Sequence, residues 1–422
     1  MFGSYCRRPK SKRSLPADRL RSVLSLQWVQ LRSQIPPVLL LLVGVLALAL
    51  YQNRIGFESQ QQNAAMGQPS APDIDLGWKA PRWLRDYVQF CGEPDTDTTR
   101  YLIWSCTDQY CSGIGDRIRG ILTAFYLAVG TRRKLKIHCI KPVNLNRSLQ
   151  PSWIDWSTDA DILFAQAPER VRVHARNDTL AYAYDTDHLR IASIFTTAME
   201  QYALYSAPQF AARFYGDEIR VGPDNWDLLA TWAWDVLFQP SPELQAEIDA
   251  VRSDADLSGD YIAVHVRHGG HWGDWLRHDT DQQLSQFIEC ATNMTKSMGG
   301  DPLIYVASDD VCVKEEFRKA LAAVRYDPQP PRHIEKTRDY EEQLRIWAEF
   351  EVIRQSSCIV ASLSGFSLWP VMTTRDPVSG RRCWARFDRC SMEMILRSRS
   401  GTIPAYDAPS ANHPDFGITA LP

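Results

Sequence analysis

The sequence lacks the residue patterns of several common functional classes. Its ten cysteines include no Cys-x-x-Cys pair and no Cys/His array with zinc spacing. It has no internal repeat, no phosphate loop of the kind that holds a sulfotransferase donor, and no basic face beyond residue 35. Nucleic acid is therefore not expected as a partner. What remains is an ordinary globular composition of 422 residues, 45% hydrophobic and 23% charged, with enough apolar material for two cores.

Charge is unevenly distributed along the chain. Residues 1–34 carry eight Lys and Arg against Asp18 alone, a net charge of +7, so the rest of the chain carries −10 of the overall −3. Residues 35–51 follow with no charge in 17 positions, the short end of what spans a bilayer. A cleaved signal peptide is the alternative, but no small-x-small cleavage site follows. The positive-inside rule favours a single-pass type II signal-anchor, and the short span fits Golgi or ER membranes.

This interpretation divides the chain into five parts. Residues 1–34 form a cytosolic tail, 35–51 the transmembrane helix, and 52–82, rich in Gln, Asn, Ser, Ala and Pro, a flexible stem. Residues 83–255 and 256–422 form two domains on the lumenal side. Glycosylation sequons at Asn146, Asn177 and Asn293 all lie beyond the span, which supports a lumenal glycoprotein.

Nine cysteines lie on the predicted lumenal side, where an oxidising environment allows disulfides. The short spacings favour the pairs Cys106–Cys111 and Cys383–Cys390. Nine is an odd number, so at least one thiol stays free or pairs between chains. Buried free cysteines are the alternative interpretation.

The hydrophobic pattern predicts an α/β fold. Residues 101–106 read as a strand, 118–129 as a helix and 134–140 as a strand. From residue 261 strands and helices alternate: 261–266, 303–308 and 358–361 are apolar strands, and 341–355 is helical. Three strand ends should therefore bring Arg/His, Asp/Asp and Ser/Gly/Ser side chains to one edge of a parallel sheet, where ligands bind in such folds.

Arg267 stands at the first of these strand ends, two residues after His265, and precedes Gly269 and Gly270. A guanidinium there suits the oxygens of a diphosphate, and the glycines let backbone approach a ligand closely. Negative charge grows on a leaving phosphate, so Arg267 is a candidate catalytic residue, with His265 as a nucleotide contact. A structural ion pair of Arg267 is the alternative. The sequence therefore predicts a nucleotide-diphosphate site.

The other two strand ends supply polar groups of different kinds. Asp309 could accept the paired N–H donors of a guanine, and Asp310 fits the N-cap of the following helix. The turn of Ser364, Gly365, Phe366 and Ser367 offers hydroxyls and backbone N–H groups to phosphate oxygens at a helix start.

Further candidates are less specific. Gly113 and Gly115, with Asp116 and Arg117, lie between a strand and a helix and could line the site from the first domain, although the third glycine of a dinucleotide fingerprint is missing. Asp274 could act as general base for an acceptor hydroxyl, or cap a helix. His268, His271 and His278 match no metal-binding signature, and no metal is expected.

Four segments resemble the GDP-fucose-dependent fucosyltransferases of the α1,2/α1,6/protein-O superfamily. They are CSGIGDRIRGILTAFYLAVGTRRKLKI (111–137), YIAVHVRHGG (261–270), IYVASDD (304–310) and FEVIRQSSCIVASLSGFSLWP (350–370), in the family's order. The resemblance implies a GT-B-like arrangement of two facing Rossmann-like domains. It also implies inverting transfer of fucose from GDP-β-L-fucose to a glycan or glycoprotein, without a required metal.

Residue by residue, the resemblance places Arg267 on the family's diphosphate arginine. His265 and Asp309 fall on nucleotide contacts, and 364–367 falls on the phosphate-binding turn. Many members carry a second arginine where this chain has His268. An acid often follows where it has Gly269 and Gly270.

Two alternatives remain open from the sequence. A manganese-dependent glycosyltransferase using another nucleotide sugar would need an Asp-x-Asp motif, and such triplets occur at 159–161, 185–187 and 254–256, none after a clear apolar strand. The second alternative is a non-catalytic lumenal glycan-binding protein. The acceptor has no sequence signature; tryptophans of 150–250, including Trp226, Trp232 and Trp234, could stack on sugars, although core packing is the commoner use.

Overall fold

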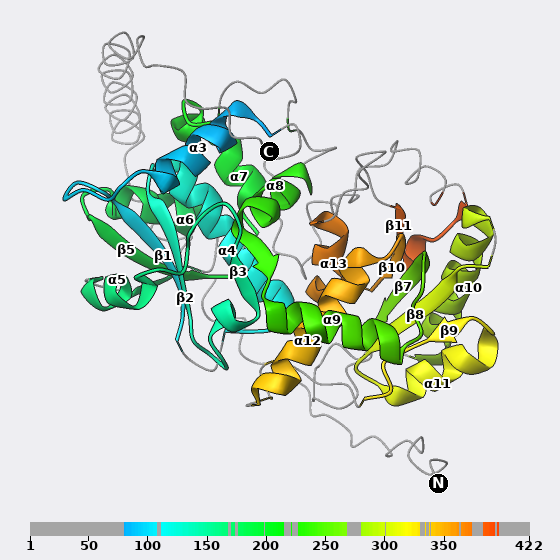
Figure 1. Ribbon diagram of the computed structural model, residues 1–422. Coiled ribbons are helices and arrows are strands. Elements are labelled where there is room, and N and C mark those ends of the chain that lie inside the picture. Colours follow the sequence, from blue (N-terminus) through cyan, green and yellow to red (C-terminus); the bar gives the residue numbers. More distant parts are fainter. Residues whose placement is uncertain are drawn as a thin grey trace, which may run out of the picture. The chain divides into compact units, whose positions relative to one another are not determined.

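In the residues that the structure describes, two parallel β-sheets have helices on both faces (Figure 1), and a small antiparallel sheet pairs β3 (Leu149–Pro151) with β6 (Phe238–Pro240). The computed structural model describes residues 80–107, 111–167, 170–173, 176–197, 199–214, 221, 227–267, 280–299, 301–329, 334, 337, 339–362, 364–373, 383–392 and 395. They all belong to one compact unit, Ile74–Pro422. The parallel sheets confirm the α/β fold class predicted from the sequence.

The first sheet has the order β2-β1-β5-β4, and all its pairings are parallel. Its side chains alternate between two cores, as the pleat of a strand requires. Leu102 and Trp104 of β1 join the large core with helix α4, whereas Tyr101 and Ile103 pack in a small core with Leu163 of α5. The elements of this part are α3 (Arg82–Gly92), β1 (Tyr101–Cys106), α4 (Ile114–Gly130), β2 (Lys134–Cys139), η1 (Leu145–Arg147), β3 (Leu149–Pro151), α5 (Ala160–Gln166), β4 (Arg170–Val173), α6 (Arg176–Asp185), β5 (Ile191–Thr196), α7 (Gln201–Tyr205) and η2 (Pro208–Phe210).

The second sheet has the order β11-β10-β7-β8-β9 and is also parallel throughout. Strand β7 is buried at every position because helices cover both faces: Ile262, Val264 and Val266 face one core, and Tyr261 and Ala263 face the other. The elements are α8 (Asp227–Leu237), β6 (Phe238–Pro240), α9 (Pro242–Asp254), β7 (Tyr261–Val266), α10 (Thr280–Met298), β8 (Leu303–Ser308), α11 (Val311–Ala320), β9 (Val324–Arg325), α12 (Tyr340–Gln355), β10 (Cys358–Ala361), α13 (Gly365–Met372), β11 (Cys383–Arg386) and η3 (Phe387–Arg389).

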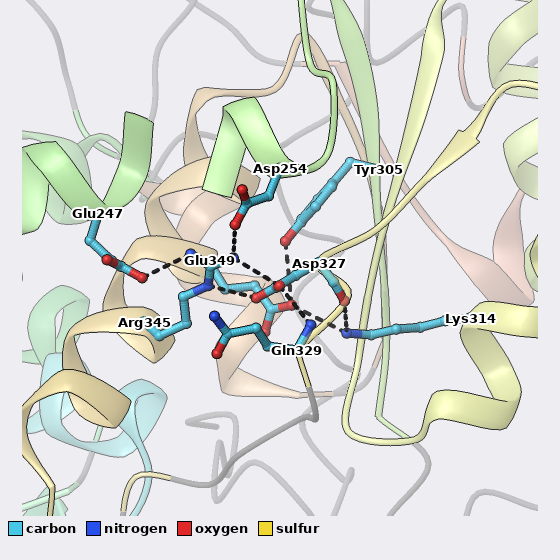
Figure 2. Close-up of polar contacts among 8 residues, drawn as sticks. All are labelled: Glu247, Asp254, Tyr305, Lys314, Asp327, Gln329, Arg345 and Glu349. Carbon is cyan, nitrogen blue, oxygen red and sulfur yellow. Dashed lines mark hydrogen bonds and ion pairs between the residues drawn. The ribbon is translucent and has the colours of Figure 1, made fainter. Parts of the chain in front are cut away.

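An ion-pair network ties α9 and α12 to the end of β9 (Figure 2). The guanidinium of Arg345 on α12 donates to both carboxylate oxygens of Asp327, at 2.7 and 2.8 Å, in a bidentate arrangement. It also donates to Glu247 at 2.8 Å and to Asp254 at 3.0 Å, both on α9. One cation therefore holds three carboxylates from two other segments of the chain.

The cysteines confirm one predicted disulfide and correct the other. Cys106 is bonded to Cys111, as expected, but Cys383 is not bonded to Cys390. Instead, Cys383 of β11 pairs with Cys358, its register partner on the neighbouring strand β10, and Cys390 pairs with Cys290 of α10. The prediction was wrong because adjacent strands bring together residues that lie 25 positions apart in sequence. Among the described residues, Cys91 and Cys139 are free thiols.

Several predictions concern parts of the chain that fall outside the described residues. They include the tail, the apolar segment 35–51 and most of the stem. In the part of the chain that the structure describes, no helix is both long and apolar enough to cross a bilayer. The boundary between two domains at residue 255 stays a prediction.

Candidate nucleotide-sugar site

Polar side chains gather at the carboxyl ends of β7, β8 and β10, as the sequence predicts. In the second sheet, β8 and β9 lie on one side of β7, and β10 and β11 lie on the other. The strand order therefore reverses between β7 and β10, and this reversal is where open α/β sheets bind ligands. His265 is in β7 and Arg267 directly follows that strand, Asp309 follows β8, and Ser362 follows β10.

His265, near the end of β7, is buried beside Ser362, which follows β10. Its Nδ1 lies 2.9 Å from Ser362 Oγ, and its ring lies 5.1 Å from the ring of Phe366. Burial and, to a smaller extent, the nearby positive charge of Arg267 together lower the pKa of His265 to about 3. The imidazole is therefore neutral at any physiological pH.

The hydroxyls around His265 indicate which ring nitrogen carries the proton. Ser367 Oγ donates to the backbone carbonyl of Ser362 at 3.1 Å or of Ser364 at 3.2 Å, so its single proton is used. Either oxygen of Ser362 and Ser367, 3.2 Å apart, can donate to the other. With Ser362 Oγ as the donor, it has no proton left for His265, and Nδ1–H of His265 donates to Ser362 Oγ. We propose this order, which makes Nε2 a hydrogen-bond acceptor.

Arg267 and Asp309 form an ion pair across the ends of β7 and β8. Arg267 Nη1 lies 2.9 Å from Asp309 Oδ2, and both side chains are largely buried. The guanine contact that the sequence assigned to Asp309 stays a prediction, and in the structure its carboxylate pairs with the guanidinium. Asp310 caps α11 as predicted, because its side chain accepts a hydrogen bond from the backbone N–H of Cys312 at 2.8 Å.

The turn after β10 begins helix α13. Ser364 is the N-cap and accepts a hydrogen bond from the backbone N–H of Phe366 at 3.3 Å. Gly365 lies directly against Gly115 in the first turn of α4: a Cβ atom on Gly115 would lie only 2.6 Å from the Gly365 carbonyl carbon. The two glycines therefore allow the starts of α4 and α13 to touch backbone to backbone.

The other predicted residues of α4 have structural partners. Gly113 is the N-cap of α4, without a side-chain cap, and Asp116 pairs with Arg119. Arg117 is buried and donates to the backbone carbonyls of Ser112 at 2.9 Å and of Lys141 at 2.5 Å. Its contacts hold the loops at the carboxyl ends of β1 and β2, and a nucleotide contact for Arg117 stays a prediction.

Asp274 lies outside the described residues, as do His268, Gly269 and Gly270. The same is true of His271, His278 and Trp226. Trp232 and Trp234 are buried in the large core.

Each acidic triplet of the metal-dependent alternative has at least one carboxylate in contact with an Arg or His side chain. Asp161 contacts His138, Asp187 contacts Arg100, Asp254 contacts Arg345 and Asp256 contacts Arg325. Within the described ranges, no group of three or more His, Cys, Asp or Glu side chains could hold a metal ion.

Sequence reasoning missed three features of this site. It did not single out Ser362 as the partner of His265, Asp309 as the partner in the ion pair that was the alternative for Arg267, or the contact between Gly115 and Gly365. The position of Ser362 directly after an apolar strand was the available signal, because such positions meet at one sheet edge. The other two features depend on which strands and helices are neighbours.

Comparisons with known proteins give structural likeness only. No family model and no curated protein matches the sequence. A mutant of Arabidopsis thaliana FUT1 in complex with GDP matches at 12% identity over 74% of this chain and 80% of that chain, with a TM-score of 0.48. POFUT1 in complex with GDP-fucose matches at 13% identity over 70% and 99%, with a TM-score of 0.40. The fucosyltransferase NodZ from Bradyrhizobium matches at 15% identity over 64% and 92%, with a TM-score of 0.39.

The chain is similar in structure to fucosyltransferases. Because these TM-scores lie below 0.5, the function proposed below rests on the residues of the chain itself.

Proposed function

We propose that the chain is an inverting glycosyltransferase that moves L-fucose from GDP-β-L-fucose to a hydroxyl of a glycan or glycoprotein. The observation that carries this proposal is the meeting of His265, Arg267, Asp309 and the 362–367 turn at the reversal of strand order. The sequence motifs that resemble the fucosyltransferases contain these same residues.

Arg267 is the proposed catalytic residue. During transfer the bond from the sugar to the diphosphate breaks, and negative charge accumulates on the departing phosphate oxygens. A guanidinium oriented beforehand by Asp309 stabilises that charge without having to reorganise. Nε2 of neutral His265 is suited to accept a hydrogen bond from a hydroxyl or N–H group of the nucleotide.

The touching starts of α4 and α13 support the assignment of a diphosphate. Backbone N–H groups in the first turn of a helix lack intrahelical partners and attract anions. Gly113 leaves the N-terminus of α4 without a side-chain cap, next to Gly365 of α13. We assign phosphate contacts to 364–367 and a supporting role to Gly113 and Gly115.

The acceptor would attack the sugar from the side opposite the diphosphate, which inverts the anomeric centre. We propose a GT-B-like arrangement, with the donor held mainly by the part that contains the second sheet. Asp274 is the candidate base for the acceptor hydroxyl. No metal is assigned a role in this scheme.

The cellular setting is part of the proposal. The basic tail and the uncharged segment 35–51 support a single-pass type II anchor, with the catalytic part in the Golgi or ER lumen. The disulfides support an oxidising compartment.

Donor binding by residues 80–422 tests the proposal. With EDTA present, we expect selective binding and hydrolysis of GDP-fucose over GDP-mannose, UDP-galactose and UDP-N-acetylglucosamine. Arg267→Ala should weaken GDP binding about 10- to 100-fold, because a charge-assisted hydrogen bond contributes about 1.5–3 kcal/mol. Isothermal titration calorimetry gives the affinities.

A matched variant separates binding from folding. Arg267→Ala leaves the buried Asp309 carboxylate without its cation, which destabilises the fold. Arg267→Met with Asp309→Asn removes both charges, and it should regain stability without regaining GDP binding. Activity with a UDP-sugar only after manganese is added would reject the fucosyltransferase proposal.

A further inference from the structure

Three cysteines and one arginine meet at the carboxyl ends of β1 and β2. Cys106 is the last residue of β1, and Cys139, the last residue of β2, is its register partner. Cys106 is bonded to Cys111, whereas Cys139 is a buried free thiol. A disulfide and an unpaired cysteine therefore lie side by side on neighbouring strands.

The two sulfurs on these strands share the same neighbours. Arg117 Nη1 lies 3.6 Å from Cys106 Sγ and 3.7 Å from Cys139 Sγ. The carbonyl oxygen of Lys141 lies 3.5 Å from the first sulfur and 3.9 Å from the second. Neighbouring strands run about 4.7–4.9 Å apart, which falls within the Cα separation of about 4.4–6.8 Å that disulfides span. A Cys106–Cys139 bond is therefore compatible with the backbone.

The segment that the existing disulfide holds is strained. Ser112, directly after Cys111, has a φ of 61°, in the left-handed region that non-glycine residues seldom adopt. Its carbonyl accepts a hydrogen bond from Arg117 Nε at 2.9 Å. Ser112 also leads into Gly113, the N-cap of α4. Release of Cys111 would let this strain relax.

We propose that Cys106, Cys111 and Cys139 form a thiol–disulfide exchange site that controls the start of α4. The Cys139 thiol loses its proton, and the thiolate sulfur attacks Cys106 Sγ. The Cys106–Cys139 bond forms as the Cys106–Cys111 bond breaks, and Cys111 leaves as a thiolate that takes up a proton. One disulfide replaces another, so no oxidant or reductant is required.

The environment of Cys139 sets the pH dependence of the exchange. Burial raises the pKa of the Cys139 thiol, while the positive charge of Arg117 on α4 acts in the opposite direction. The preceding strand residue, His138, pairs with Asp161 of α5. Because the thiolate is the nucleophile, the exchange rate should rise about tenfold per pH unit below that pKa.

Alkylation of the native protein tests the proposal. The folded protein is incubated with excess N-ethylmaleimide between pH 6 and 8.5, quenched in acid and digested without reduction for mass spectrometry. We expect the label on Cys111 together with a Cys106–Cys139 crosslink, both accumulating faster at higher pH. Cys139→Ser should abolish both signals, and Cys91→Ser, which removes the other free thiol, should leave them unchanged.

A second variant makes the test independent of the exchange rate. Cys111→Ser leaves Cys106 and Cys139 as neighbours, and under glutathione disulfide they should form a crosslink. Hydrogen exchange at residues 111–119 of this variant should be faster than in the wild type. The proposal is overturned if N-ethylmaleimide labels Cys139 but never Cys111 in the wild type, or if both thiols of Cys111→Ser stay free.

Discussion

At the level of single residues, the surroundings of His265 change its protonation behaviour. Burial and Arg267 hold its pKa at about 3, far below that of a free imidazole. The proposed donor order Ser367, Ser362, His265 leaves Nε2 as an acceptor. A buried neutral histidine is therefore part of the candidate site.

We expect His265 to remain the neutral Nδ1–H tautomer down to pH 4. Between pH 6 and pH 4 the unfolded chain binds a proton at this histidine and the folded chain does not. The contribution of His265 to the free energy of unfolding should therefore fall by about 1.4 kcal/mol for each pH unit as the pH decreases. Nitrogen-15 NMR of labelled histidine gives the tautomer, and urea unfolding of the wild type and His265→Asn gives the difference in slope.

Ser367→Ala is the control for the proposed donor order. Without Ser367 Oγ as acceptor, Ser362 can donate to His265 Nδ1, and the proton should move to Nε2. An unchanged tautomer in Ser367→Ala would contradict the hydrogen-bond order. The low pKa of His265 would still be explained by burial and Arg267.

At the level of elements, the contact between α4 and α13 depends on two glycines. Gly115→Ala places a Cβ atom 2.6 Å from the Gly365 carbonyl carbon and 2.7 Å from its Cα, so the helix starts must separate. We expect a loss of about 1–3 kcal/mol in the free energy of unfolding, as for overpacked cores. GDP affinity should fall with it, and chemical denaturation and calorimetry measure the two effects.

Gly92→Ala is the matched control at the end of α3. A Cβ atom at Gly92 would meet no heavy atom within 4 Å. Alanine favours helix relative to glycine by about 0.5–1 kcal/mol, so stability should be unchanged or slightly higher. Equal losses of stability in Gly115→Ala and Gly92→Ala would contradict the idea that the close contact between Gly115 and Gly365 is the cause.

The Arg345 network stabilises the packing of α9 and α12 against the second sheet (Figure 2). Arg345→Met removes the cation from Asp327, which is buried, and from two further carboxylates. We expect a loss of about 3–5 kcal/mol, because an uncompensated buried charge remains. Urea unfolding measures this loss.

Asp254→Asn tests the same network at its exposed end. The Asp254 side chain is 47% exposed, so its ion pair with Arg345 should contribute at most about 1 kcal/mol. A loss as large as that of Arg345→Met would contradict the assignment of the stabilisation to the buried Asp327.

At the level of the whole molecule, disulfides link distant parts of the second sheet and its helices. Cys290–Cys390 joins α10 to the segment after η3 and closes a loop of 100 residues, whereas Cys358–Cys383 spans 25. Replacing Cys290 and Cys390 by Ala should cost about 4–5 kcal/mol, since a longer loop gains more entropy on unfolding.

The Cys358/Cys383 pair supplies the comparison. Its replacement by Ala should cost less, about 3–4 kcal/mol, because its loop is shorter. Calorimetric unfolding of the two double variants gives the order, and the reverse order would contradict the loop-length explanation.

Much of the fold was predictable because it depends on local pattern. Runs such as YIAVHV and LIYVAS are apolar at nearly every position, which is typical of parallel strands covered on both faces. Asp310 was predictable as a helix cap because capping involves only the next few residues. The pairing of Cys383 was not, because it depends on which strand lies beside β11.

Local sequence pattern was enough to predict the α/β class and the strand ends that carry Arg267, Asp309 and Ser364. Hydrophobic periodicity and strand termini depend on residues that are close together in the sequence. The pairing of Asp309 with Arg267, of Ser362 with His265 and of Gly115 with Gly365 depends on how the chain packs in three dimensions. Strand order and helix packing create these contacts between residues far apart in the chain, and no local pattern encodes them.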